Sequence, residues 1–261
     1  MKKYLLIFLT FITTFTYSFK REDIKIFSKL MNKMIPVTVI LPDGYSNDKK
    51  YSVIYTLHGW SGNNKNFPEK TPIGELSDKY NVIFISPDGN YDSWYVDSEV
   101  IKKSKYSTFI SKELVENIDN KYSTIKEAKN RAITGLSMGG YGAFFIGINN
   151  VNIFGNIGSM SGGLIPEDFK GNWGISKVIN SNWEEYNIDS LVHKLLFTKT
   201  NIIFDCGVDD FFIESNRKVH QKLLSLNINH DYIERAGAHT WAYWSNSIKY
   251  QTLFFVENFN K

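Results

Sequence analysis

A glycine-rich turn between an apolar segment and a run of small residues constrains the fold of this chain more than any other feature. From Arg131 the sequence reads R-A-I-T-G-L-S-M-G-G-Y-G-A, which places Gly135, Ser137 and Gly139 in G-x-S-x-G spacing. A serine on a sharp turn between a strand and a helix takes strained backbone angles, and neighbours that carry a Cβ atom would crowd both elements. The pattern therefore predicts a strand, a tight turn at Ser137 and a helix.

Short β-branched segments alternate with helical patterns along the rest of the 261 residues. This alternation predicts one α/β domain with a mostly parallel sheet that helices cover on both faces. The expected strands are 37–41, 53–57, 82–85, 132–134, 157–160 and 202–204, with a strand-like segment at 232–235, and the expected helices are 109–122, 140–149, 214–226 and 241–259. The polar stretch 162–197 lacks a strand pattern, so we expect an insertion over the carboxyl edge of the sheet.

The composition is that of a globular protein. Lys and Arg number 30 and Asp and Glu 27, scattered without a basic stripe, so we expect no nucleic-acid partner. The apolar share of 43% argues against both a disordered chain and a multi-span membrane protein. Cys206 is the single cysteine, which precludes an internal disulfide, and we expect a buried, inert thiol there.

The amino terminus has the form of a signal peptide. Lys2 and Lys3 precede an apolar run over residues 4–17, with small residues that suit cleavage at its end. This run is shorter than the roughly 20 residues that span a bilayer, and an uncleaved anchor is the alternative. We assign residues 1–18 to a signal peptide and 19–261 to the folded domain. The expectation is a secreted or periplasmic protein with no stable membrane anchor after cleavage.

A serine hydroxyl becomes an effective nucleophile only when a base accepts its proton, so Ser137 requires a histidine. Of the 5 histidines, His239 stands in A-G-A-H-T-W, a loop of small residues between a strand-like segment and the last helix. We expect His239 to be this base. The other histidines of the second half, His193, His220 and His230, are interpreted as solvated surface residues.

The third partner must be a carboxylate that holds the imidazole in the right tautomer. The chain order Ser, Asp, His points to the loop after Phe204, which reads D-C-G-V-D-D-F-F. Asp205 closes a strand and could pair with the backbone, while Asp209 or Asp210 could cap the helix that follows. Spacing alone does not separate Asp209 from Asp210.

The segment L-H-G-W-S-G-N at His58 follows an early buried strand, which suits a loop that donates a backbone amide to a developing oxyanion. A tetrahedral intermediate carries negative charge on the former carbonyl oxygen, and each preorganised amide is worth about 3 to 4 kcal/mol in mutational terms. We expect the amides of Trp60 and Met138 to be the donors. The ring of His58 is expected to face the core and to fix the loop by hydrogen bonds.

Five segments in this order resemble the esterase D family of α/β-hydrolases, which includes S-formylglutathione hydrolases, tributyrin-type, feruloyl and acetylxylan esterases, and mycolyltransferases. The segments are L-H-G-W-S-G-N, S-P-D-G with S-W-Y, R-A-I-T-G-L-S-M-G-G-Y-G-A, C-G-V-D-D-F and G-A-H-T-W. The resemblance implies an α/β-hydrolase catalytic domain over residues 19–261. It selects Asp210 as the acid, because the family carboxylate directly precedes the Phe of this segment. It also implies that Trp94 and Tyr95 line a substrate pocket, with core packing under the loop as the alternative.

The resemblance implies a serine carboxylesterase. Ser137 would attack the ester carbonyl, His239 would act first as base and then as acid, Asp210 would orient it, and water would release the acyl-enzyme without metal or cofactor. The expected substrates are short-chain or aromatic acyl esters, small or linked to a polysaccharide, with the rings of Trp60 and Trp241 as further aromatic contacts. The chain departs from S-formylglutathione hydrolases, which are cytosolic and carry a reactive thiol near the oxyanion loop. The alternatives are an extracytoplasmic acyltransferase acting on sugar or lipid alcohols and a non-catalytic relative that binds a carbohydrate or siderophore.

Overall fold

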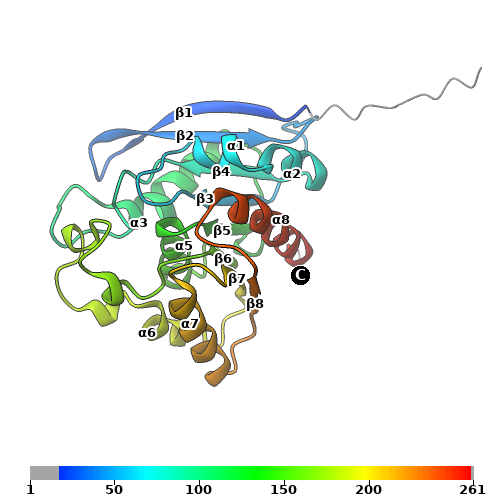
Figure 1. Ribbon diagram of the computed structural model, residues 1–261. Coiled ribbons are helices and arrows are strands. Elements are labelled where there is room, and N and C mark those ends of the chain that lie inside the picture. Colours follow the sequence, from blue (N-terminus) through cyan, green and yellow to red (C-terminus); the bar gives the residue numbers. More distant parts are fainter. Residues whose placement is uncertain (1–17, 260–261) are drawn as a thin grey trace, which may run out of the picture.

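An eight-stranded sheet with helices on both sides forms the framework of the computed structural model, which describes residues 18–259 (Figure 1). The strand order is β1-β2-β4-β3-β5-β6-β7-β8. The pairs β1–β2 and β2–β4 are antiparallel, and the remaining neighbours are parallel. The strands are β1 Lys20–Ser28, β2 Lys33–Leu41, β3 Val53–Leu57, β4 Ile83–Pro87, β5 Arg131–Gly135, β6 Asn156–Met160, β7 Asn201–Gly207 and β8 Asp231–Arg235.

Helices cover both faces of this sheet, each over its own apolar cluster (Figure 1). One face carries α1 Asn66–Lys70, α2 Ile73–Tyr80 and α8 Trp241–Asn258. The other face carries α3 Tyr106–Thr108, the π-helix η1 Phe109–Leu114, α4 Val115–Lys121, α5 Met138–Asn149, α6 Ile188–Leu191 and α7 Ile213–Ser225. Short 3₁₀ turns complete the chain: η2 Ala128–Asn130, η3 Pro166–Phe169, η4 Ile175–Lys177, η5 Trp183–Glu185 and η6 Val192–Leu195.

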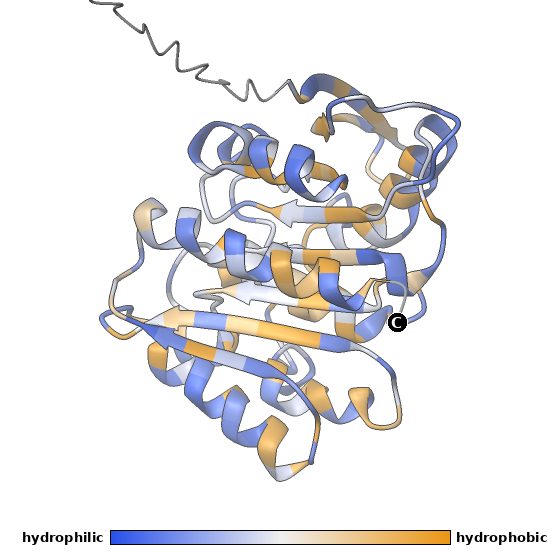
Figure 2. Cartoon of the chain, turned by 90° about the vertical axis from the view of Figure 1, so that its right-hand side faces the viewer, coloured by the Kyte–Doolittle hydropathy of each residue, from blue (hydrophilic) through white to orange (hydrophobic). Residues whose placement is uncertain are grey.

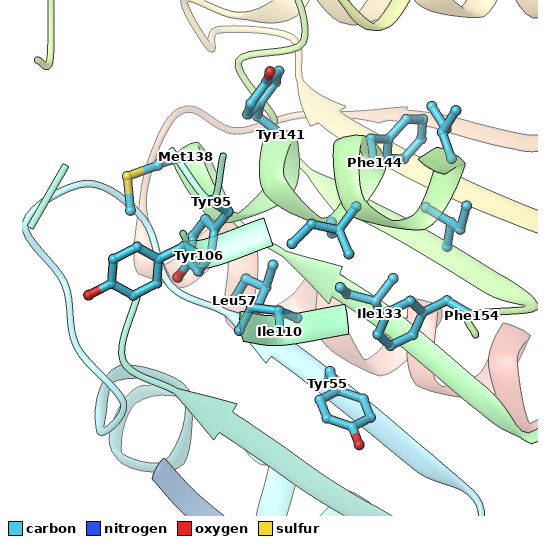
Figure 3. Close-up of a cluster of buried hydrophobic side chains, with 14 of the residues drawn as sticks. Tyr55, Leu57, Tyr95, Tyr106, Ile110, Ile133, Met138, Tyr141, Phe144 and Phe154 are labelled. Atoms are coloured by element: carbon cyan, nitrogen blue, oxygen red, sulfur yellow. The ribbon is translucent and has the colours of Figure 1, made fainter. Parts of the chain in front are cut away.

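The central strands are apolar on both faces because both faces are covered. Every residue of β3, β4 and β5 is buried. Figure 2 shows hydrophobic stretches in orange along the strands and hydrophilic turns in blue on the outer helices. In Figure 3, Tyr55 and Ile133 of the sheet lie beneath Phe144 of α5, together with other buried side chains. Each fully buried side chain of this size contributes about 1.5 to 3 kcal/mol, so the two clusters hold β5 and α5 firmly on either side of Ser137.

The sequence-based fold class is confirmed, with three differences in the amino-terminal half of the chain. All seven expected strand segments are present, but β1 was missed because its first four residues, 20–23, are charged and mostly exposed. Charged edge strands resist pairing with other chains, so this charge is compatible with a strand at the edge. The expected helix 109–122 starts three residues earlier and contains a π-helical turn. The short helices α1 and α2 were not predicted at all.

The stretch 162–197 contains turns and short helices but no strand, as the sequence predicts. The predicted signal peptide, residues 1–18, lies outside the described residues except for Ser18 and stays a prediction. No helix within residues 18–259 is long and apolar enough to cross a membrane.

Candidate active site

Ser137 occupies the tight turn between β5 and α5 in a strained backbone conformation. Its φ of 54° and ψ of −118° are rare for a residue with a side chain. A Cβ atom on Gly135 would lie 2.4 Å from the carbonyl oxygen of Gly139, and one on Gly139 would lie 2.0 Å from that of Leu57. Only glycine fits at either position, so the G-x-S-x-G pattern reflects backbones packed too closely for any side chain.

Ser137, His239 and Asp210 form one continuous hydrogen-bonded chain. His239 Nδ1 lies 2.8 Å from Asp210 Oδ2, and His239 Nε2 lies 2.9 Å from Ser137 Oγ. An ionised carboxylate only accepts hydrogen bonds, so Asp210 holds the proton on Nδ1 and leaves Nε2 free to accept the serine proton. The second carboxylate oxygen of Asp210 accepts the amide of Phe212 at 2.9 Å, which fixes the side chain at the start of α7. This arrangement can activate a hydroxyl nucleophile.

The two competing carboxylates of the same segment lie elsewhere. Asp205 is fully buried and accepts hydrogen bonds from Gln251 (2.7 Å) and Arg235 (3.1 Å), away from His239. Asp209 is exposed, with its backbone amide donating to Gly237 at 3.0 Å. Of the three candidates, the structure therefore brings Asp210 alone to the imidazole. Cys206, in the same segment, is buried, and burial raises the pKa of its thiol. A buried thiol with a raised pKa is unreactive, which agrees with the expected inert thiol.

The loop after β3 lies beside Ser137 and is fixed by the ring of His58. His58 Nε2 accepts the amide of Gly89 at 2.7 Å, so Nδ1 carries the proton and donates to the carbonyl of Gly59 at 2.8 Å. The expected structural role of the ring agrees with these bonds. Within residues 18–259, the amides of Trp60 and Met138 donate to no other group. Two unengaged amides at the edge of this site suit an oxyanion hole.

Trp94 and Tyr95 follow β4 and both have positive φ, at 51° and 57°. The two side chains lie in different places. Trp94, although only 1% exposed, is one of the residues that line the cavity, whereas Tyr95 lies in the core beside α5, as Figure 3 shows. The Tyr95 hydroxyl donates to the carbonyl of His58 at 3.1 Å, and burial keeps its pKa well above the usual value, so it stays protonated. Tyr95 thus supports the oxyanion loop and does not line the substrate cavity, which corrects the sequence-based assignment.

A cavity of about 280 Å³ opens above Ser137 and His239. Besides these two, its wall consists of aromatic side chains, the loop after β3, two side chains of α1 and Leu136 next to Ser137: Gly59, Trp60, Ser61, Gly62, Asn66, Lys70, Trp94, Leu136, Trp173, Phe211, Trp241 and Trp244. Trp60 and Trp241 lie in the wall as expected. Further aromatic residues of the wall were not predicted, among them Trp173, which the insertion 162–197 supplies, and Phe211. Phe211 could have been predicted from the D-D-F-F segment, because it directly follows Asp210. No local sequence pattern indicates that Trp173 lies at the site.

Aromatic rings enclose the imidazole of His239. Phe211 packs against it at 4.3 Å between ring centroids, and Trp244 meets it edge-on at 4.8 Å. Trp173 stacks on Phe211 at 5.4 Å. These contacts limit rotation of the imidazole and restrict water at one side of the site.

The other histidines of the second half take no part in the site. His193 is exposed and bonds to the carbonyl of Ser190. His220 and His230 were interpreted as separate solvated residues, but they form a direct hydrogen bond of 2.7 Å and are partly buried. Within residues 18–259, no three His, Cys, Asp or Glu side chains group as a metal site would require, and the expectation of chemistry without metal or cofactor stays a prediction.

Comparison with known proteins places the chain in a family. The Esterase family model matches residues 28–255. The chain belongs to the Esterase family. An acetyl esterase of Caldicellulosiruptor saccharolyticus is 30% identical to this esterase over 253 residues, which cover 87% of the present chain and 94% of the relative. The resemblance to the esterase D family and the assignment as a carboxylic ester hydrolase are confirmed.

Solved structures agree with the α/β-hydrolase fold. A ferulic acid esterase superposes with a TM-score of 0.79 at 26% identity, covering 94% of this esterase and all (100%) of that chain. FphF, a fluorophosphonate-binding serine hydrolase of Staphylococcus aureus, superposes with a TM-score of 0.84 at 20% identity over 91% of this esterase and 98% of that chain. At that identity FphF supports the fold alone.

Proposed function

We propose that this esterase hydrolyses short-chain or aromatic acyl esters through a catalytic triad of Ser137, His239 and Asp210. The observation that carries the proposal is the unbroken hydrogen-bond chain from Asp210 Oδ2 to Ser137 Oγ, with its serine end at the cavity. Ser137 attacks the carbonyl carbon and His239 Nε2 takes its proton. The same proton then passes to the departing alcohol oxygen, and a water molecule repeats the sequence to release the acid.

The amides of Trp60 and Met138 are proposed to bind the oxyanion of the tetrahedral intermediate. Met138 is the first residue of α5, so its amide is one of the four at a helix start that lack an intrahelical partner. Trp60 is held by the loop that His58 and Tyr95 support. Because both amides are fixed before substrate arrives, little reorganisation is needed when the charge develops.

The size and lining of the cavity support a small acyl group. About 280 Å³ lies at the lower end of the range for small-molecule sites. Trp94, Trp173 and Phe211 supply an apolar wall that suits an acetyl, a short aliphatic or a planar aromatic acyl chain. The acetyl esterase and ferulic acid esterase relatives are named for esters of these two kinds.

The setting is proposed to be outside the cytoplasm. The support is the charged and apolar pattern of residues 1–18, together with Trp60, which is 38% exposed, lines the cavity and could meet a polysaccharide carrying the ester. Amino-terminal sequencing of the protein, together with its recovery from the periplasm, the medium or the cytoplasm, tests this proposal. A chain outside the cytoplasm that starts near residue 19 supports export. An uncleaved chain that stays in the cytoplasm contradicts it.

Hydrolysis of a p-nitrophenyl acyl series, with methyl ferulate and acetylated xylan, tests the activity. We expect turnover to favour the short chains and to fall by roughly a thousandfold or more in Ser137→Ala. Ser225→Ala, a change at an exposed serine of α7, is the control and should match the wild type. Full activity in Ser137→Ala would contradict the proposal. With an added alcohol as competing acceptor, free acid as the main product supports hydrolysis, whereas a new ester as the main product indicates acyl transfer.

A further inference from the structure

The active-site cavity has one cationic side chain in its wall and no carboxylate. Lys70, at the end of α1, is that cation, and neither Asp nor Glu occurs among the lining residues within the described part of the chain. The neighbouring Glu69 pairs with Arg21 at 3.4 Å. Across residues 18–259, Lys70 forms no ion pair of its own, in contrast with Lys177 of the insertion 162–197, which binds Asp92. A cleft with an uncompensated positive charge attracts anions.

A second donor lies on the same face of α1. Asn66 precedes Lys70 by four residues, so the two side chains are neighbours on the helix, and both line the cavity. The side-chain oxygen of Asn66 accepts the amide of Asn63 at 3.0 Å. This bond fixes the orientation of the side-chain amide and leaves its NH₂ group, which donates to no described residue, available to an acceptor.

Ring contacts place Lys70 on the His239 side of the cavity. The Lys70 ammonium lies 4.8 Å from the ring centre of Trp241. Trp241 meets Trp244 edge-on at 5.3 Å, and Trp244 in turn meets His239 at 4.8 Å. The indole of Trp241 restrains the lysine by a cation–π contact, which leaves the ammonium donors free for a further partner.

The alcohol half of the ester must lie on this same side. His239 Nε2 delivers a proton to the departing alcohol oxygen, so that oxygen lies next to the imidazole. Substituents of the alcohol then extend along Trp244 and Trp241 toward Asn66 and Lys70. We propose that Asn66 and Lys70 form a subsite for an anionic group, carboxylate or phosphate, on the alcohol half of the substrate. The subsite rests on the proposed function, because it depends on His239 acting at the leaving group.

Three acetyl esters of similar size test the subsite: 4-acetoxybenzoate, 4-acetoxyphenyl phosphate and the neutral 4-acetoxybenzamide. The measured quantity is kcat/KM for each charged ester divided by kcat/KM for the neutral one. In Lys70→Met this ratio should fall about five- to tenfold, the size expected for one charge-assisted contact near solvent. Lys70→Arg should retain most of the ratio. A larger loss on one charged ester than on the other identifies carboxylate or phosphate as the better ligand.

Matched variants separate the subsite from general charge effects. Lys79 also lies over an aromatic ring, 4.9 Å from the centre of Tyr80, but outside the cavity, so Lys79→Met should leave the ratio unchanged. Asn66→Asp keeps the acceptor for Asn63 while placing a carboxylate one turn from Lys70, and it should lower the ratio as Lys70→Met does. An unchanged ratio in both Lys70→Met and Asn66→Asp would overturn the subsite even if the neutral ester is hydrolysed normally. Failure of the wild type on all three esters and on p-nitrophenyl acetate would instead count against the proposed function.

Discussion

Asp205 and Arg235 form an ion pair of 3.1 Å between β7 and β8, the two strands whose following loops carry Asp210 and His239. The carboxylate is fully buried and the guanidinium side chain is 19% exposed. Burial raises the pKa of Asp205, and the adjacent Arg235 opposes that rise. The ion pair therefore joins the two strands close to where the loops that carry Asp210 and His239 begin.

Helix α8 completes this buried network. Ser247 donates to one oxygen of Asp205, and Gln251 donates to the other at 2.7 Å. The Arg235 guanidinium also lies over the rings of Tyr243 and Tyr250, 5.0 and 4.7 Å from their centres. Because His239 stands between β8 and α8, the network anchors the chain on both sides of the proposed base.

Asp205→Asn should destabilise the fold strongly, because it removes the charge that pairs with Arg235 but keeps the shape. Breaking a buried pair from one side typically costs about 3 to 5 kcal/mol. Urea denaturation measures the free energy of unfolding. Asp209→Asn, at an exposed position of the loop that follows β7, is the control, and a change within about 0.5 kcal/mol is expected there. A loss below about 1 kcal/mol in Asp205→Asn would show that the pair contributes little to stability.

Gly139→Ala should disrupt the turn at Ser137, because the added Cβ atom would lie 2.0 Å from the backbone carbonyl oxygen of Leu57. Backbone must move to accept it, and overpacking of this kind costs about 1 to 3 kcal/mol or more. We expect a lower melting temperature together with a large loss of esterase activity. Gly171→Ala is the matched control, since no atom lies within 4 Å of its added Cβ. Equal stability and activity in the two variants would contradict the packing argument.

The His220–His230 pair predicts a loss of stability on the acid side. Burial and, to a lesser degree, the neighbouring His230 lower the pKa of His220, with Glu234 acting in the opposite direction. A lowered pKa means that the unfolded chain binds more protons, so this contribution is present above the unfolded pKa of about 6.5 and is lost as the pH falls through the lower folded pKa. The slope of unfolding free energy against pH between about 5 and 7 should be shallower in His220→Gln than in the wild type. A parallel slope would exclude His220 as the source.

The sequence predicted the parts of the molecule that depend on local rules. The strands, the turn at Ser137 and the loop of His239 follow from apolar patterns and from glycines that backbone contacts require. The placement of Tyr95 could not be predicted, because the local sequence around an aromatic loop residue does not distinguish a side chain that faces the cavity from one that faces the core. Trp173 was missed because only tertiary packing brings the insertion 162–197 against Phe211. The strand β1 was missed because its first residues are charged and do not form an apolar strand pattern. One edge and most side chains of this strand face solvent.

Covalent labelling by a fluorophosphonate tests the central proposal most directly, because the probe reacts with a serine only when a base and an oxyanion site activate it. Intact-mass measurement of the folded wild type should show one added equivalent, and peptide mapping should place it on Ser137. Ser137→Ala, with a far-UV circular dichroism spectrum like that of the wild type, should remain unlabelled. An unlabelled folded wild type, or equal labelling of Ser137→Ala, would contradict the assignment of Ser137 as the nucleophile.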